Sequence, residues 1–468
     1  MKVSLNDSSF SYDVHSLVKA FYPDEDVSVS AEDGGFITVD VYGSAAEVTA
    51  GSIKHTGQLA DPKRPEMKNL LKRTLYGALL ELTGKDLPWG TMTGIRPVKV
   101  PMKLIREGAD DERIFSYMKS VYLCSDEKIR LAMQIAHRES GIIDSLNPGG
   151  FCLYIGIPFC PTTCMYCSFT SYPIASWADR TGEYLSALRR ELDFFSGHFA
   201  GRRADAVYIG GGTPTTLSPD ELSWLMGYIR DSFDLSAVKE FTVEAGRPDS
   251  ITDEKLAAIR EGGADRISIN PQTMNEETLR IIGRRHTTED TVTAFEKARR
   301  AGFSNINMDI ILGLPGEDEK MLANTLKSVK DLGPDSLTVH SMAIKRAAHM
   351  HDYLRKAGIS SVNTPEMMHM ADECAASMGM SPYYLYRQKN MSGNFENVGY
   401  ALSGCFGIYN IAIMEEVCDI AAAGAGTISK RVFSGDRIER CDSVKDVDLY
   451  ISRIDEMIER KKKLFKGE

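Results

Sequence analysis

The sequence of 468 residues has no apolar run long enough to cross a membrane as a helix. Its longest candidates, around Met308–Leu314 and Ile420–Ile428, are short or interrupted by glycine. The first residues, Met1–Asp7, carry no basic, apolar or cleavage-like region, so we read no export signal there. These absences predict a cytoplasmic protein without a membrane span.

An excess of basic residues is also missing: 55 Lys and Arg stand against 65 Asp and Glu, which gives a formal net charge of −10. Nucleic-acid binding depends largely on neutralising phosphates, so this charge argues against a nucleic-acid partner. Hydrophobic residues make up 43% and charged residues 26%, as in ordinary globular proteins. A disordered, collagen-like or coiled-coil chain is therefore excluded.

Cysteine is present in an odd number, nine, which without an export signal argues against a disulfide framework and for metal or redox chemistry. Three of the nine fall within eight residues: Cys160, Cys164 and Cys167. This cluster is the strongest chemical signal in the chain.

The pattern of apolar and polar residues along the sequence predicts three domains. Residues 1–149 read as an α+β domain that ends at the breaker Asn147-Pro148-Gly149-Gly150. From 150 to 345, short apolar strands alternate with longer amphipathic helices, which predicts a parallel sheet covered by helices. After residue 345 the pattern loosens into a C-terminal α+β extension, 346–468. Within the first domain, Val27–Ala31 and Phe36–Tyr42 flank Asp33-Gly34-Gly35, which predicts a hairpin.

The middle domain repeats its β–α unit six times, fewer than the eight of a closed barrel, so we expect an open, partial (β/α)6 barrel. Chemistry in such folds lies at the carboxyl ends of the strands. The six strands are expected at 153–157, 206–209, 240–243, 266–270, 306–312 and 336–341, and the helices between them near 179–196, 219–231, 253–261, 287–301 and 318–331.

The pattern Cys-x3-Cys-x2-Cys follows the first of these strands directly and supplies three thiolates at one site. A [4Fe-4S] cluster held by three cysteines keeps one iron open to another molecule. A structural zinc site needs four protein ligands, and no His or Cys follows Cys167 closely enough to complete one. The spacing favours an iron–sulfur cluster, with a zinc-stabilised binding module as an alternative.

This motif after the first strand of a β–α repeat resembles the radical S-adenosylmethionine (SAM) superfamily. More narrowly, Tyr154–Cys167 resembles the opening motif of oxygen-independent coproporphyrinogen III oxidases and their relatives. The first 150 residues and Pro382–Asn390 resemble the HemZ-type branch of coproporphyrinogen dehydrogenases. The resemblance implies a radical SAM oxidoreductase that binds a [4Fe-4S] cluster through Cys160, Cys164 and Cys167.

Glycines in the loop Gly210–Thr215 would let backbone groups approach a ligand without a Cβ in the way. Glu244, at the end of the third strand, could accept hydrogen bonds from ribose hydroxyls, with a capping or solvent-facing residue as the other interpretation. The resemblance implies SAM contacts at Gly211, Gly212, Thr213 and Glu244, at Tyr154, Tyr166, Ala343 and Ile428, and for a second SAM at Gln272, Arg284 and Asp309.

Asp309 lies within an apolar strand, where an uncompensated carboxylate is costly and needs a partner. Arg284 could be that partner, or it could clamp the carboxylate of SAM. Two positions depart from the oxidases, which have His at Gly156 and a fourth cysteine at Phe169. The form without the fourth cysteine also resembles the haem-chaperone branch.

The implied reaction is oxidative decarboxylation of two propionates of coproporphyrinogen III by a 5′-deoxyadenosyl radical, giving protoporphyrinogen IX. The implied partners are this or a related tetrapyrrole and an electron donor such as flavodoxin or ferredoxin. A haem-binding chaperone and a radical SAM haem-degrading methyltransferase are alternatives on the same scaffold. A basic group that could meet a tetracarboxylate, with surface charge as the other interpretation, comprises Lys345, Arg346, Arg387, Lys389 and Arg431.

Overall fold

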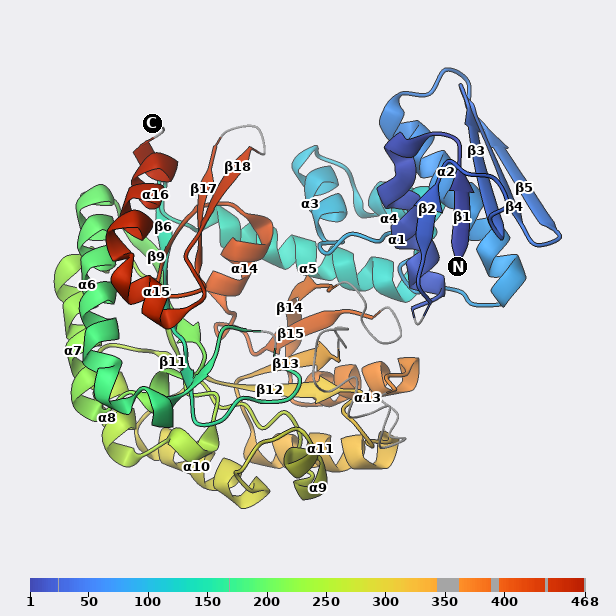
Figure 1. The fold of residues 1–468 in the computed structure, drawn as a ribbon. Helices are drawn as coiled ribbons and strands as arrows, with labels where there is room; N and C mark the ends of the chain where they lie inside the picture. Colours follow the sequence, from blue (N-terminus) through green and yellow to red (C-terminus); the bar gives the residue numbers. More distant parts are fainter. Residues whose placement is uncertain (24, 168, 343–361, 389–394, 434–436, 467–468) are drawn as a thin grey trace. The chain divides into compact units, whose positions relative to one another are not determined.

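The computed structural model shown in Figure 1 describes residues 1–466 except 24, 168, 343–361, 389–394 and 434–436. The chain divides into two compact units, Met1–Arg138 with Leu385–Glu396, and Glu139–Tyr384 with Asn397–Glu468. The division falls within α5 (Asp126–Asp144) and β14 (Ser381–Tyr386). The division into three domains at 149 and 345 stays a prediction.

The first unit contains a five-stranded sheet in the order β2-β1-β3-β4-β5. Its strands are β1 (Lys2–Leu5), β2 (Ser28–Ser30), β3 (Ile37–Tyr42), β4 (Ala45–Ala50) and β5 (Ile53–Gln58). Besides α5, its helices are α1 (Ser11–Phe21), α2 (Arg64–Thr83), α3 (Lys99–Arg106) and α4 (Asp111–Tyr122).

The predicted hairpin in this unit is wrong, because β1 lies between β2 and β3 and runs parallel to both. Gly35 packs against β1: its N–H donates to Ser4 Oγ at 2.9 Å, and a Cβ there would lie 2.6 Å from the Ser4 nitrogen. The glycines that suggested a tight turn therefore allow a crossing loop to pass close to β1. The antiparallel neighbours are β3 with β4 and β4 with β5.

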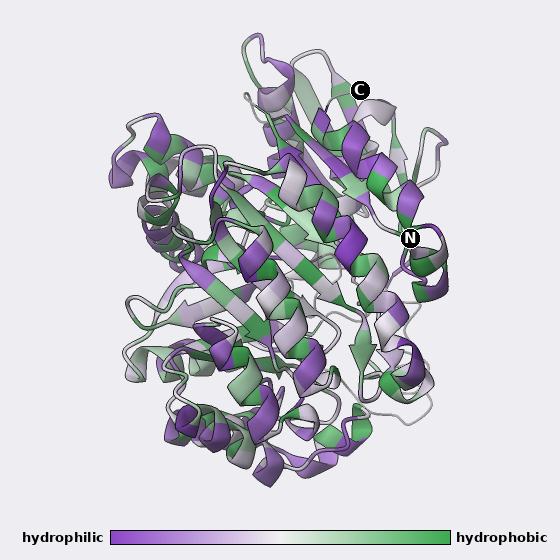
Figure 2. Ribbon diagram, turned by 90° about the vertical axis from the view of Figure 1, so that its left-hand side faces the viewer, coloured by the Kyte–Doolittle hydropathy of each residue, from purple (hydrophilic) through white to green (hydrophobic). Residues whose placement is uncertain are grey.

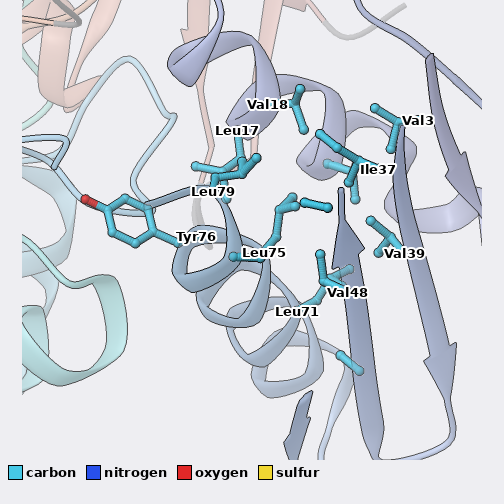
Figure 3. Packing of buried hydrophobic residues seen from close by; sticks show 14 of the residues in the cluster. Val3, Leu17, Val18, Ile37, Val39, Val48, Leu71, Leu75, Tyr76 and Leu79 are labelled. Atoms are coloured by element: carbon cyan, nitrogen blue, oxygen red, sulfur yellow. The ribbon is translucent and has the colours of Figure 1, made fainter. Parts of the chain in front are cut away.

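One face of this sheet is buried by α2, whose apolar side chains point toward the strands in Figure 3. Leu71, Leu75 and Leu79 of the helix are fully buried, as are Ile37 and Val48 of the sheet. Each buried side chain of this size stabilises the fold by about 1.5–3 kcal/mol. This face supplies the core of the first unit.

The second unit contains an eleven-stranded sheet in the order β14-β15-β13-β12-β11-β10-β9-β6-β16-β17-β18. Its central strands are β6 (Phe151–Ile157), β9 (Ala204–Gly211), β10 (Glu240–Glu244), β11 (Arg266–Ser268), β12 (Ile306–Leu312) and β13 (Ser336–Ser341). These six are parallel, which confirms the partial (β/α)6 barrel.

Strands that the sequence analysis did not include extend this sheet at both ends. β16 (Asp419–Ala423) is parallel to β6, and β17 (Ile428–Val432) and β18 (Ile438–Asp442) continue from it as an antiparallel pair. At the opposite end, β15 (Asn397–Ala401) is antiparallel to β13. The C-terminal residues thus complete the barrel sheet on both sides of the six-strand core.

Helices form the outer layer of the second unit in Figure 1. In Figure 2, hydrophobic and hydrophilic residues alternate along these helices, as expected when one face packs on the sheet and the other meets solvent. They are α6 (Thr181–His198), α7 (Pro219–Ser232), α8 (Asp253–Glu261), α10 (Thr288–Arg300) and α11 (Glu319–Leu332). The shorter α9 (Glu276–Ile281) follows β11, and the C-terminal part adds α13 (Pro365–Ser377), α14 (Ile408–Glu415), α15 (Val447–Ser452) and α16 (Ile454–Lys466).

Within the described part of the chain, we find no helix both long and apolar enough to span a membrane. The parallel direction of the central strands brings their carboxyl ends to one edge of the sheet. The segments that follow these strands therefore define the region in which to look for the site.

Candidate functional site

The three cysteines lie on a loop that follows β6. Cys160 ends the short strand β7 (Phe159–Cys160), which pairs with β8 (Tyr172–Pro173) and so closes the loop. The loop is also attached to the turn after α9, because Met165 N–H donates to Ile282 O at 3.1 Å and Thr162 Oγ1 donates to Gly283 O at 3.2 Å. Backbone and hydroxyl contacts thus hold the loop before any ligand is considered.

All three thiols are free and half-buried. Burial raises the pKa of Cys160 to about 11, and it also raises the pKa of Cys167. Cys160 accepts a hydrogen bond from Thr213 Oγ1 at 3.4 Å, which partly offsets this effect. A metal cation nearby would reverse the balance, since coordination deprotonates a thiol.

Arg247 is a site residue that the sequence analysis missed. It lies three residues after the end of β10, and only 3% of its side chain is exposed. Its Nη1 is 3.6 Å from Cys164 Sγ and also donates to Thr162 O and Oγ1, while Nε and Nη2 donate to the two carboxylate oxygens of Asp249. The residues around Arg247 in the sequence carry no signal of this contact with the cysteine loop.

The donor set fits an iron–sulfur cluster better than a single metal ion. Nowhere in the described ranges do three His, Cys, Asp or Glu side chains gather as ligands of one ion. Each thiolate of a [4Fe-4S] cluster binds a separate iron, so its ligands need not converge on one point. Cys164 is contacted by Arg247 and by Arg284, and these buried guanidinium groups would offset the negative charge of thiolates.

The glycine segment at the end of β9 packs on the protein itself. A Cβ at Gly210 would lie 2.8 Å from Glu244 Oε2, and one at Gly212 would lie 2.6 Å from Phe159 O. Gly211 has φ +106°, which favours glycine, and Thr213 N–H donates to Phe159 O at 2.7 Å. These contacts position the loop beside the first cysteine, and SAM contacts at Gly211, Gly212 and Thr213 stay predictions.

Glu244 ends β10 and is fixed by two donors, Tyr208 Oη at 2.5 Å and Gly211 N–H at 3.2 Å. Burial raises the pKa of Glu244 to about 7, and the charge of Asp309 contributes to the rise. The ring of Tyr208 stacks with that of Tyr154 at 6.0 Å and with that of Tyr409 at 4.7 Å. The carboxylate therefore lies beside a stack of tyrosines inside the barrel.

Polar atoms without a partner gather after β11. Gln272 Oε1, Asn270 Oδ1 and Arg284 Nε are buried and have no hydrogen-bond partner. Gln272 has φ +67°, a conformation disfavoured for a residue with a side chain, and its backbone bridges to β12 through hydrogen bonds with Asp309 O and Ile311 N–H. Orphaned polar atoms and local strain together are typical of a ligand site.

Asp309 does not pair with Arg284, so that part of the expectation needs correction. It accepts a hydrogen bond from Asn307 Nδ2 at 2.7 Å and lies 3.6 Å from His340 Nε2. Burial would raise the pKa of Asp309, but its bonds to His340, Asn307 and Thr338 outweigh burial and hold the pKa below its ordinary value. Arg284 instead donates to Asn270 O at 2.5 Å and contacts Tyr166 and Cys164.

The remaining predicted contacts have different surroundings. Tyr166 packs beside the apolar cluster that contains Ile282 and Leu314. Ile428, at the start of β17, is 45% exposed, and Ala343 lies outside the described residues.

Two members of the basic group lie within the described residues. Arg387 is buried in the first unit and donates to Met92 O. Arg431, in the second unit, donates to Leu464 O. Lys345, Arg346 and Lys389 lie outside the described residues.

Gly156 and Phe169 are the two positions that differ from the oxidases. A Cβ at Gly156 would lie 2.6 Å from Thr427 Cγ2, so Thr427 occupies the space next to that position. A histidine there would require this threonine to move. Phe169, at the position of the fourth cysteine, is 73% exposed.

Comparison with known proteins agrees with this geometry. The model of the radical SAM superfamily matches residues 154–329. The oxygen-independent coproporphyrinogen-III oxidase-like protein HemZ of Bacillus subtilis is 38% identical over 452 residues, which cover 91% of this chain and 89% of the relative. The heme chaperone HemW of B. subtilis is 38% identical over 207 residues, 43% of this chain and 53% of HemW.

Among solved structures, coproporphyrinogen III oxidase HemN of Escherichia coli superposes with a TM-score of 0.53 and 24% identity. The superposition covers 68% of this chain and 72% of HemN, and it supports the fold. The superfamily implies a [4Fe-4S] cluster and SAM, and the cysteine loop with its buried arginines suits both. Since the similarity to HemZ runs along nearly the whole chain, this protein belongs to the HemZ-like family of oxygen-independent coproporphyrinogen III oxidase relatives within the radical SAM superfamily.

Proposed function

We propose that the protein converts propionate side chains of coproporphyrinogen III to vinyl groups without oxygen, forming protoporphyrinogen IX. The observation that carries this proposal is the cysteine loop bound to the turn after α9, next to the buried, unpartnered atoms of Arg284 and Gln272. A cluster site beside buried polar atoms that lack partners is what a reductive SAM enzyme needs.

Cys160, Cys164 and Cys167 would hold the cluster, and Glu244 and the glycine loop would hold the first SAM. A second SAM would be held by Gln272, Arg284 and Asp309. Gln272 follows β11 and bridges to β12, the strand that contains Asp309. Arg284 reaches the same segment through its hydrogen bond to Asn270 O. The Nε of Arg284 is buried without a hydrogen-bond partner, so it is available to donate to the carboxylate of SAM. The stacked rings of Tyr154, Tyr208 and Tyr409 would exclude water from the side of the site next to Glu244.

When bound, the cluster and SAM supply a carbon-centred radical able to take a hydrogen atom. For each propionate, the substrate loses one hydrogen atom to the radical, carbon dioxide leaves and one electron passes to an external one-electron acceptor, so that a vinyl group remains. No protein nucleophile or general base is required, so the residues of the chain bind, orient and exclude water. Flavodoxin or ferredoxin would supply electrons to the cluster, in the cytoplasm.

Haem binding without turnover is the second candidate. It is favoured by Phe169, which stands in place of the fourth cysteine of the oxidases, and by the similarity to a protein named as a heme chaperone. This candidate predicts stoichiometric haem uptake and no change in coproporphyrinogen III.

The test is one anaerobic assay of cluster-reconstituted protein with SAM, a reductant and coproporphyrinogen III, analysed by mass spectrometry. Stepwise loss of two carboxyl groups together with 5′-deoxyadenosine supports the proposal. SAM cleavage with unchanged porphyrinogen contradicts it and favours haem binding. Methylated tetrapyrrole with S-adenosylhomocysteine would indicate the haem-degrading methyltransferase instead.

A further inference from the structure

Arg247 is a buried cation beside a cluster ligand. Only 3% of its side chain is exposed, and removing a guanidinium from water costs several kcal/mol unless the group is paired and hydrogen-bonded. Every nitrogen of this guanidinium donates to an acceptor. Nε and Nη2 donate to Asp249, and Nη1 donates to the cysteine loop. The side chain is thus fixed in one orientation.

The contact of Nη1 with the loop is specific to one cysteine. Nη1 lies 3.6 Å from Cys164 Sγ and 3.1 Å from Thr162 Oγ1. Cys160 accepts instead from a threonine hydroxyl, and Cys167 accepts from a backbone N–H and a serine hydroxyl. Cys164 therefore differs from the other two ligands in being contacted by guanidinium groups, those of Arg247 and Arg284.

Asp249 positions Arg247 and is itself only partly exposed, at 24%. Burial would raise the pKa of Asp249, but the fork from Arg247 outweighs burial and keeps the carboxyl ionised. His286 Nδ1 lies 4.0 Å from the same carboxylate. Burial and the nearby Arg284 lower the pKa of His286 to about 4, so at neutral pH this ring carries no charge. Arg247 is then the cation that balances Asp249 and holds the loop.

Hydrogen bonds to cysteine sulfur and nearby positive charge both stabilise the more negative, reduced form of an iron–sulfur cluster. We propose that Arg247 donates to the Cys164 thiolate and raises the reduction potential of the cluster, with Asp249 as its positioning residue. This rests on the cluster that the proposed function requires, but not on the identity of the substrate. Arg247 thereby makes reduction of the cluster accessible to a weaker electron donor.

The test is a redox titration of reconstituted protein with dithionite, without porphyrinogen, following the electron paramagnetic resonance signal of the reduced cluster. The variants are Arg247→Gln, Arg247→Lys and the matched control Arg285→Gln, which removes one exposed charge from the same turn as Arg284. Iron and sulfide content are measured on each sample, so cluster loss is separated from a change in potential.

We expect Arg247→Gln to shift the reduction equilibrium at least tenfold toward the oxidised cluster, equal to 59 mV for one electron. Arg247→Lys keeps the charge but cannot keep both the Asp249 fork and the Cys164 contact, so we expect a smaller shift in the same direction. Arg285→Gln should leave the potential unchanged.

An unchanged potential in Arg247→Gln with full iron content would overturn the proposal, as would an equal shift in Arg285→Gln. If Arg247→Gln does not retain the cluster, Arg247→Lys decides: a lowered potential supports the proposal, and the parent potential contradicts it. A lowered potential in protein that does not decarboxylate coproporphyrinogen III would contradict the proposed function and leave this inference standing.

Discussion

Two buried networks of a cation and a carboxylate in the second compact unit differ in the polar atoms around them. In the first, Lys461 Nζ donates to Glu191, Ala422 O and Ser443 Oγ, and the other oxygen of Glu191 accepts from Tyr450 Oη and Gly424 N–H. In the second, Arg247 and Asp249 are paired, but Arg284, His286 and Gln272 nearby have buried atoms without partners.

This difference distinguishes a network that stabilises the fold from one that lies beside the candidate site. The Glu191–Lys461 network is saturated, and it attaches the C-terminal helix α16 to α6 and to the turn after β16. At the cysteine loop, Arg247 and Asp249 satisfy each other, but the nearby buried atoms have no hydrogen-bond partner in the protein. A bound ligand would supply these partners. Substitutions in the two networks should therefore change different measurements.

The largest effect is expected from Cys164→Ala, which removes one of three cluster ligands. Bound iron after anaerobic reconstitution should fall to background, because two thiolates cannot hold the cluster. The free energy of unfolding of the metal-free protein should change by less than about 1 kcal/mol, since the thiol is half-buried and on a loop. Iron analysis and urea unfolding measure the two quantities.

Cys374→Ala is the matched control, because Cys374 is also half-buried and lies on α13, outside the cysteine loop. Retained iron in Cys164→Ala would refute the assignment of this thiol as a ligand.

Lys461→Met should act on stability instead. It leaves the buried carboxylate of Glu191 unpaired, so we expect the unfolding free energy to fall by about 3–5 kcal/mol, with part recovered in Lys461→Met combined with Glu191→Leu. Lys462→Met, at a 39% exposed lysine on the same helix, should cost less than about 1 kcal/mol. A loss in Lys461→Met no larger than in this control would show that the network is not structural.

Arg284→Gln should weaken SAM binding about tenfold to a hundredfold, the ~1.5–3 kcal/mol of a hydrogen bond to a charged group. The buried guanidinium is fixed by Asn270 O and leaves Nε for a ligand. Equilibrium dialysis with reconstituted protein measures the dissociation constant. Arg280→Gln, at a 73% exposed arginine of α9, is the control, and equal affinity in both variants would remove Arg284 from the SAM site.

The last effect, that of Glu244→Gln, should be visible in the pH dependence of stability. The pKa of Glu244 is raised from 4.5 to about 7, so between these values the native protein binds more protons than the unfolded chain. The parent should therefore lose stability relative to Glu244→Gln as pH rises from 4.5 to 7, by up to ~3 kcal/mol, and the difference should level off above pH 7. Urea unfolding of metal-free protein across this range tests it; a difference that does not vary with pH would contradict the raised pKa.

Much of the barrel could be predicted from sequence because its signals are local. The strands Ile306–Leu312 and Ser336–Ser341 have the predicted bounds, and α7 begins at the predicted Pro219 after the Ser218 cap. Apolar runs, caps and glycine stops are properties of neighbouring residues, so one window of sequence contains them. The cysteine spacing is local in the same sense.

Pairings between distant residues were the predictions that failed or were missing. The sequence favoured a hairpin of Val27–Ala31 with Phe36–Tyr42, but β1 separates them. It offered Arg284 as a partner of Asp309, which instead contacts Asn307 and His340. Nothing in the window around Arg247 indicated that its guanidinium would reach a cysteine more than 80 residues earlier.

The β–α order, the three-cysteine loop and the family could be read from the sequence alone, because each depends on residues close together along the chain. Which cation pairs with which anion depends on the fold. The parallel sheet brings the ends of β6, β10 and β11 to one edge, and burial there makes every unpaired charge costly. Because of this cost, Arg247 pairs with Asp249 beside Cys164, and Lys461 of α16 pairs with Glu191 of α6.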